Sequence, residues 1–246
     1  MEWIYLSPHF DDVAYSCGGL LWEQSNEGDR VHIWTICGGK PLEDDLSPFA
    51  SFKHETWETV GDAVAIRRRE DLKACSELGA EALHFQILDC IYRKDPQSGE
   101  FLYDSEQSLW GPLHPSDQRL IQLLRIEFAK KLPERAQVVS PLALGDHVDH
   151  RLTRTVAESL GRPLLYYADF PYVLRANEHL HDLKRRGWTQ IIRPISPDGL
   201  RTWENAIAAY LTQISTFWRD VEEMRAVLRD YVRNAGGVSL WHPPDE

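Results

Sequence analysis

The sequence predicts a doubly wound α/β fold, a three-layer sandwich in which helices cover both faces of a mostly parallel sheet. Short apolar runs alternate along the chain with segments of helical periodicity. Residues 31–37 are apolar at both odd and even positions, as in a parallel strand buried on both faces. Turns are short except at 40–58 and 92–113. A chain of 246 residues fits a single domain over 1–246.

In the first half of the chain, strands are predicted at residues 3–7, 31–37 and 83–88, helices at 18–28 and 63–78, and a loop at 40–58. The first strand is an apolar run that Pro8 ends. Gly28 and Gly79 stop the two helices, as glycine often does. The loop is rich in proline and aromatic residues, which fit either an aromatic flap over a binding site or a packed surface loop.

The second half begins with an irregular segment, 92–113, which is a second candidate rim, and a helix to about residue 130 follows. Strands are predicted at residues 138–141, 164–167 and 190–195. Residues 173–187 are a helix or loop, and helical periodicity is found at 147–160 and 199–233. Ser116 or Asp117 can cap the first of these helices. The last stretch is long enough for two helices. Gly236 and Gly237 end it, and we expect a polar tail after them.

A cluster of polar side chains follows the first strand directly. His9, Asp11 and Asp12 come just after Pro8. Ligands bind in open α/β sheets beyond the carboxyl ends of the strands, so these residues lie where chemistry is expected. Two neighbouring carboxylates raise each other's proton affinity unless a cation lies between them. A metal ion is the natural cation, because imidazole and carboxylate are ordinary zinc ligands.

A second cluster lies far downstream, in Gly145-Asp146-His147-Val148-Asp149-His150. It also follows an apolar run and leads into a helix. Residues three apart lie on one helix face, so His147 and His150 can both turn toward the crevice. The two clusters together supply His, Asp and His for a metal, with a further Asp and His for proton transfer.

These motifs resemble the signatures of the LmbE-like (PIG-L) N-acetylglucosamine deacetylase family. Ser7 to Asp12 is similar to its Pro-His-x-Asp-Asp signature, and residues 145–150 to its His-x-Asp-His signature. Residues 67–79, with Arg67 and Glu70, resemble the family's Arg-x-x-Glu helix that ends in Leu-Gly. The resemblance extends to about residue 172, and beyond it the sequence offers no match. It implies an LmbE-type, Rossmann-like fold.

The hypothesis for the chemistry is a single zinc ion held by His9, Asp12 and His150, which leaves one position open for water. Asp11 is then free to act as general base, because adjacent side chains diverge. A protonated His147 would stabilise the oxyanion. Asp149 would orient His147 and fix its charge. The sequence leaves zinc and Fe²⁺ open as the native metal.

The resemblance assigns the same roles position by position and adds the substrate, an N-acetylated amino-sugar conjugate. It also suggests Arg67 and Asp89 as substrate-binding residues. Some members of the family carry a tyrosine shortly before the second motif. Here Pro141-Leu142-Ala143-Leu144 lies at that place, so oxyanion help from such a tyrosine is not expected.

The composition bears on partners and compartment. A formal net charge of −11 argues against a nucleic acid or an anionic membrane as the main partner. The run Arg67-Arg68-Arg69 is typical of a solvated helix face, although one arginine can turn inward. The four cysteines form no Cys-x-x-Cys pair and lie among apolar residues. With no signal peptide visible, we expect a cytoplasmic protein. A homo-oligomer is left open.

Two rival functions remain at this stage. Two histidines and a carboxylate also form the facial triad of non-haem Fe(II) oxygenases. Those enzymes usually have β-rich scaffolds, and oxygen consumption with a 2-oxo acid would favour them. The other rival is a sugar- or metal-binding module without turnover. Asp11 and His147 argue against it, because a binding site needs no acid–base pair.

Overall fold

The computed structural model describes residues 1–42, 45–57 and 62–244. Seven strands of this part form one sheet in the order β3-β2-β1-β4-β5-β7-β6. They are β1 (Glu2–Ser7), β2 (Arg30–Thr35), β3 (Glu81–His84), β4 (Gln137–Pro141), β5 (Leu164–Tyr167), β6 (Thr189–Arg193) and β7 (Val238–His242). The strands from β3 to β5 pair in parallel, and β7 pairs antiparallel with both β5 and β6.

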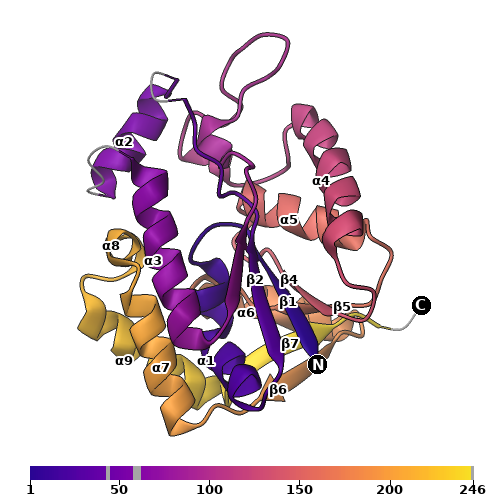
Figure 1. The fold of residues 1–246 in the computed structure, drawn as a ribbon, viewed down its shortest axis with the longest axis vertical. Helices are drawn as coiled ribbons and strands as arrows, with labels where there is room; N and C mark the ends of the chain where they lie inside the picture. The colour runs from indigo at the N-terminus through magenta and orange to yellow at the C-terminus, as the bar shows by residue number, and fades with distance from the viewer. Residues whose placement is uncertain (43–44, 58–61, 245–246) are drawn as a thin grey trace.

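Helices cover both faces of the sheet (Figure 1). On one face lie α1 (Asp12–Asn26), α3 (Ala63–Leu78) and α7 (Pro197–Ala208), which pack together; α4 (Gln118–Lys131) and α5 (Val148–Glu158) pack together on the other. The other helices are α2 (Pro48–Thr56), α6 (Asn177–Arg185), α8 (Leu211–Phe217) and α9 (Val221–Ala235), with short 3-10 turns at Cys90–Tyr92, Gln107–Leu109, Pro115–Asp117 and Tyr172–Arg175. The predicted mostly parallel, doubly wound sheet is confirmed.

The sheet order places a crevice between β1 and β4. The chain winds outward from β1 to β2 and β3, and then returns to β4 on the other side of β1. Connections therefore leave the carboxyl ends of β1 and β4 toward opposite faces, and such a switch point opens a crevice where ligands bind. Both polar clusters of the sequence follow these two strands.

Two elements in the first half differ from the prediction. The first helix begins at Asp12 and not at residue 18. Ser7 explains this, because its hydroxyl donates to the His9 carbonyl at 2.6 Å and accepts the Val13 amide at 3.1 Å, which turns the chain at once. The third strand is Glu81–His84 and not 83–88.

The predicted loop 40–58 contains the helix α2. Residues 43, 44 and 58 of this loop lie outside the described part of the chain. Ser47 caps this helix by accepting the Ala50 amide, and Pro48 occupies its first turn. This is a favourable helix start that the sequence interpretation overlooked.

The C-terminal region departs most from expectation. The stretch 199–233 contains three helices, α7, α8 and α9, where two were predicted. Residues 238–242 of the expected polar tail form β7, and residues 245 and 246 are not described. Val238, Leu240 and Trp241 are at most 1% exposed, because β7 lies between β5 and β6 in the sheet. Burial of these side chains makes this segment a strand.

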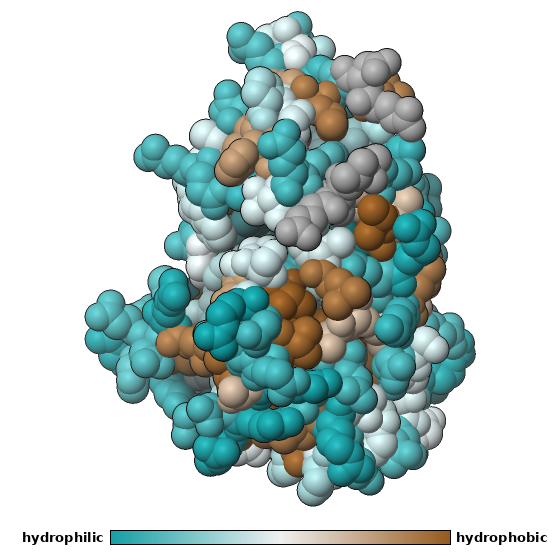
Figure 2. Space-filling model, turned by 90° about the vertical axis from the view of Figure 1, so that its left-hand side faces the viewer, coloured by the Kyte–Doolittle hydropathy of each residue, from teal (hydrophilic) through white to brown (hydrophobic). Residues whose placement is uncertain are grey.

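The side of the molecule formed by α2, α3, α8 and α9 is largely hydrophilic, with apolar residues gathered near its centre (Figure 2). Leu72 of α3 and Leu211 of α8 are among the exposed apolar side chains of the described residues. The opposite face of α8 is buried, since Ile214 is 6% exposed. Among the described residues, no helix has both the length and the apolar character needed to cross a membrane.

Candidate metal centre and active site

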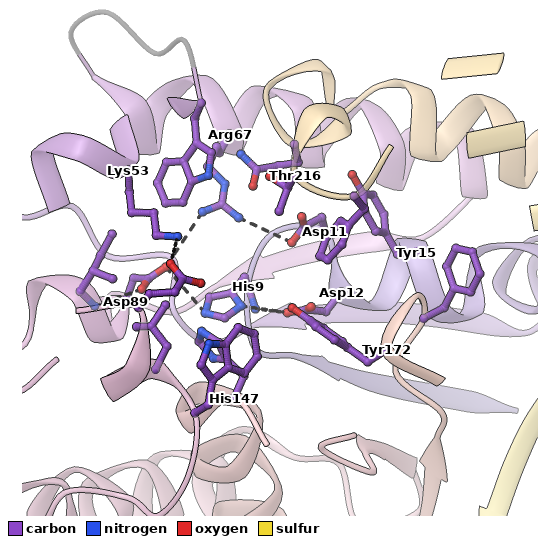
Figure 3. A pocket seen from close by; sticks show the side chains of 18 residues that line it. His9, Asp11, Asp12, Tyr15, Lys53, Arg67, Asp89, His147, Tyr172 and Thr216 are labelled. Atoms are coloured by element: carbon purple, nitrogen blue, oxygen red, sulfur yellow. Dashed lines mark hydrogen bonds and ion pairs between the residues drawn. The ribbon is translucent and has the colours of Figure 1, made fainter. Parts of the chain in front are cut away.

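A pocket opens at the crevice, and both predicted rims contribute to it (Figure 3). Lys53 and Trp57 come from the 40–58 segment, and Glu106 and Trp110 come from the 92–113 segment. The Lys53 ammonium lies 2.5 Å from the Glu106 carboxylate and joins the two rims. The floor carries His9, Asp11, Asp12 and His147.

Asp12 lies between two histidines from distant parts of the chain. Its Oδ2 is 3.1 Å from His9 Nδ1, and its Oδ1 is 3.1 Å from His150 Nε2. The His9 amide also donates to Asp12 Oδ2 at 2.7 Å. Three predicted metal ligands therefore meet at one point, although their donor atoms come from the ends of β1 and β4.

A second carboxylate lies behind each of these histidines. Asp149 Oδ2 is 3.1 Å from His9 Nε2, and Asp169 Oδ1 is 2.6 Å from His150 Nδ1. A carboxylate behind a ligating histidine holds the proton on the nitrogen that faces it, so Asp149 and Asp169 can leave His9 Nδ1 and His150 Nε2 free for a metal. This is the usual way in which proteins prepare histidines to ligate a metal.

The Asp149 carboxylate is held by more than His9. Its Oδ2 accepts the Cys90 amide at 2.9 Å, and its Oδ1 is paired with Arg93. Arg93 is in turn paired with Asp117, 3.1 Å away. The prediction that Asp149 fixes His147 therefore needs correction: its carboxylate binds His9 and Arg93, because the first turn of α5 directs this side chain toward β1.

His147 is the N-cap of α5 and has a different environment. Its Nδ1 accepts the backbone N–H of Asp149 at 3.2 Å. The proton of the neutral ring is then on Nε2, which can donate but cannot ligate a metal. His147 stands edge-on to His9 and Trp110, with ring centroids 5.0 and 5.2 Å apart.

Asp11 turns away from Asp12, as the divergence of adjacent side chains predicts. Its Oδ1 lies 3.5 Å from the Arg67 guanidinium, which is also 4.0 Å from Asp89 (Figure 3). Arg67 is the buried residue of the Arg67-Arg68-Arg69 run, at 8% exposure. Trp57 packs on its guanidinium, 4.9 Å from the ring centre. Asp11, Arg67, Asp89 and Trp57 all line the pocket.

Burial and these contacts raise the pKa values of some titratable groups of the site and lower that of another. Burial raises the pKa of Asp11 to about 6, although the Arg67 charge opposes this. Burial disfavours the charge of His150, but Asp12 and Asp169 outweigh it and raise the pKa of that histidine to about 10. Burial and the neighbouring His9 hold the pKa of His147 well below its usual range. The pocket thus combines a neutral imidazole with a carboxyl group that titrates near neutrality.

Sequence reasoning missed several residues of the site. Asp169 was given no role, although it follows a predicted strand at the same sheet edge. Arg93 lies in an irregular segment and Gln213 lies on α8, and neither position carries a motif. Tyr172 follows β5 and lies beside the site, with its ring centroid 5.8 Å from that of His150.

Metal-binding capacity is also visible in the donor atoms. Within the described residues, His9, His147 and His150 each offer a ring nitrogen within 4.8 Å of the others. Asp12 is not in this donor group, but the tautomer of His147 argues against ligation by that ring, so Asp12, 3.1 Å from both other histidines, stays the predicted third ligand. The four cysteines are free and buried, as expected for structural thiols.

Comparison with known proteins identifies relatives in sequence and in fold. The chain is 32% identical over 212 residues to 2'-N-acetylparomamine deacetylase of Niallia circulans, which covers 76% of this chain and 72% of that protein. The zinc-inhibited form of teicoplanin deacetylase Orf2 has a TM-score of 0.81 at 24% identity, over 99% of this chain and 97% of that chain. A deacetylase–teicoplanin complex has a TM-score of 0.78 at 25% identity, over 100% of both chains.

The family assignment rests on the sequence match together with the fold. A sequence model of the family described as GlcNAc-PI de-N-acetylase matches residues 4–160, which include β1, α3, β4 and α5. This segment carries both polar clusters and the Arg67 helix. The protein belongs to the PIG-L (LmbE-like) family of de-N-acetylases.

Proposed function

We propose that this protein is a zinc-dependent hydrolase that removes the N-acetyl group from an amino-sugar conjugate. The observation that carries the proposal is the Asp12 carboxylate between His9 and His150, with Asp11 turned away toward Arg67. Family membership and the similarity to an acetylparomamine deacetylase support the reaction and the substrate class. No observation favours an oxygenase or a binding module without turnover.

The donor set fits zinc. Two imidazoles and one carboxylate are ordinary zinc ligands, and three protein ligands leave the fourth position of a catalytic site open. Fe²⁺ would also accept these donors. When bound, the ion would supply a Lewis acid beside the acetyl carbonyl and make a neighbouring water easier to deprotonate.

Asp11 is the general base of the proposed reaction. It takes a proton from water as the water oxygen bonds to the acetyl carbon, and it gives that proton to the amine nitrogen as the C–N bond breaks. The products are acetate and the free amine. A pKa of about 6 suits this double role, because the group is mostly ionised at neutral pH and still basic.

The remaining residues hold and polarise the substrate. The Nε2–H of the neutral His147 can donate to the acetyl oxygen as negative charge develops there. This differs from the protonated His147 of the hypothesis, because the Asp149 amide and burial both favour the neutral ring. Asp149 positions His9, and Asp169 positions His150. Arg67 and Asp89 remain proposed sugar contacts.

The test is a panel of N-acetylglucosaminides that includes N-acetylparomamine, with acetate release and metal content measured on the same preparation. We expect acetate release that is lost after chelation and restored by Zn²⁺. His150→Ala should empty the metal site and abolish turnover. His181→Ala, which removes an exposed histidine of α6, is the matched control and should retain both. A full metal complement in His150→Ala, or no acetate release from any member of the panel, would refute the proposal.

A further inference from the structure

The helix α8 forms a wall of the pocket although it lies outside the family match at 4–160. Gln213, Thr216 and Phe217 of this helix line the pocket. Figure 3 shows Thr216 close to Arg67 and Asp11, across the pocket from His147. The family segment therefore supplies the proposed chemistry, and the C-terminal region supplies the facing wall.

Two consecutive carboxylates of α3 hold the start of α8. Glu70 accepts both the backbone N–H and the hydroxyl of Thr212, at 3.0 and 2.7 Å. Asp71 accepts the Tyr210 hydroxyl at 2.7 Å and also lies 2.7 Å from His84 Nε2. A helix of seven residues is too short to be stable alone, so these contacts determine where α8 lies.

The same helix α3 also carries Arg67, one turn before Asp71. Residues four apart lie on one helix face. One rigid helix thus sets both the position of Arg67 beside Asp11 and the position of the α8 wall. Any displacement of α8 relative to the reacting groups must break the Glu70–Thr212 contacts.

The pocket face of α8 carries neutral groups suited to a sugar. The Gln213 side chain is 4% exposed and uses its amide nitrogen on the Thr212 hydroxyl, which leaves further donor and acceptor capacity. The Thr216 hydroxyl can both donate and accept. The Phe217 ring packs edge-on against Tyr172, with centroids 5.6 Å apart. Sugar rings offer the same combination of hydroxyl groups and apolar faces.

We infer that α8 selects the substrate, an inference that rests on the proposed function. Gln213 and Thr216 hydrogen-bond sugar hydroxyl groups away from the acetamido group, and Phe217 packs on the sugar ring. Glu70 is the positioning residue that fixes where this wall lies relative to the proposed metal centre.

The first experiment compares the best substrate of the panel with its monodeoxy analogues. Thr216→Val removes one hydroxyl at nearly constant volume and should lower kcat/KM on the parent by roughly 2- to 13-fold, the usual range for one neutral hydrogen bond. On the analogue that lacks the contacted hydroxyl, the same variant should cost nothing further. Ser215→Ala, an exposed hydroxyl deletion one residue away, should leave all rates unchanged.

The second experiment tests the positioning role. Glu70→Gln replaces one of the two carboxylate oxygens, which accept hydrogen bonds, by an NH₂ group, which donates them. That NH₂ group then faces the Thr212 amide or hydroxyl. We expect KM to rise several-fold with kcat and zinc content nearly unchanged, the pattern of lost uniform binding. A fall in kcat together with zinc, at unchanged KM, would overturn the role of Glu70.

The outcomes separate this inference from the function on which it rests. If Thr216→Val lowers kcat/KM by the same factor on the parent substrate and on every analogue, or lowers it on none, α8 does not recognise the sugar. The proposed deacetylation is not affected by that result. If the wild-type protein releases no acetate from any substrate, the proposed function fails and the inference fails with it.

Discussion

Asp169 offers a sharp test of the proposed metal centre, because Asp169→Asn changes one atom type at a buried position. In the native protein Asp169 Oδ1 faces His150 Nδ1 at 2.6 Å, and Oδ2 accepts the Leu144 amide at 3.0 Å. Asparagine keeps only one oxygen acceptor. If that oxygen stays on Leu144, the amide NH₂ faces His150 Nδ1 and requires a lone pair there.

In the neutral His150 ring that a metal requires, the one proton must then lie on Nε2, the nitrogen that faces Asp12. A protonated nitrogen cannot ligate, so zinc has to work against the preferred tautomer. Loss of such an orienting partner typically costs 10- to 100-fold in metal affinity, which is about 1.4–2.8 kcal/mol. We expect the Kd for Zn²⁺ of Asp169→Asn to rise by this factor.

The assay is competition with a chelating indicator, combined with circular dichroism to confirm that the variant is folded. Asp230→Asn is the matched control, since Asp230 is an exposed residue of α9 paired with Arg233. Its Kd should equal that of the wild type. A Kd within twofold of the wild type for Asp169→Asn would refute the tautomer argument.

Three further predictions follow from the site. Asp11→Asn should retain zinc and lose roughly 10²- to 10⁴-fold in kcat, measured by acetate release with metal analysis, because only the base is removed; loss of zinc would contradict this role. The raised pKa of His150, about 10, means that the metal-free protein carries its proton at pH 7 and loses it only as pH rises through 10. Zinc must displace that proton, so the affinity for Zn²⁺ should increase with pH, and calorimetry in two buffers should detect proton release on binding. An affinity for Zn²⁺ that does not change with pH would count against ligation by His150. Gly145→Ala should destabilise the protein by about 1–2 kcal/mol or more in urea unfolding, because φ is 87° and a Cβ would lie 2.9 Å from Tyr172. Gly161→Ala, at φ 62° with open space around it, should cost less, and equal costs would exclude the clash.

Much of the fold was predictable because its signals are local. The strand that Pro8 ends and the helix that Gly79 ends are signalled by residues within a few positions of one another. Two parallel strands, each followed by a polar cluster, are enough to predict that His9, Asp12 and His150 lie at one sheet edge. The family resemblance extended this expectation to the deacetylase fold.

The C-terminal third was less predictable. The segment at Val238 forms an interior antiparallel strand because it pairs with both β5 and β6, and five residues of sequence cannot show this. The helix α8 is likewise too short for a periodicity signal, and its position depends on Glu70 and Asp71, which are about 140 residues away.

The amino-acid sequence by itself determined which chemical groups the site contains and which strand ends carry them, since both follow from residue type and local pattern. Only the tertiary structure decided the pairings: Asp149 with His9, Asp169 with His150, and Glu70 with Thr212. The first pair spans 140 positions. Such contacts depend on how helices and strands pack, and packing is a property of the whole chain that no short stretch of sequence contains.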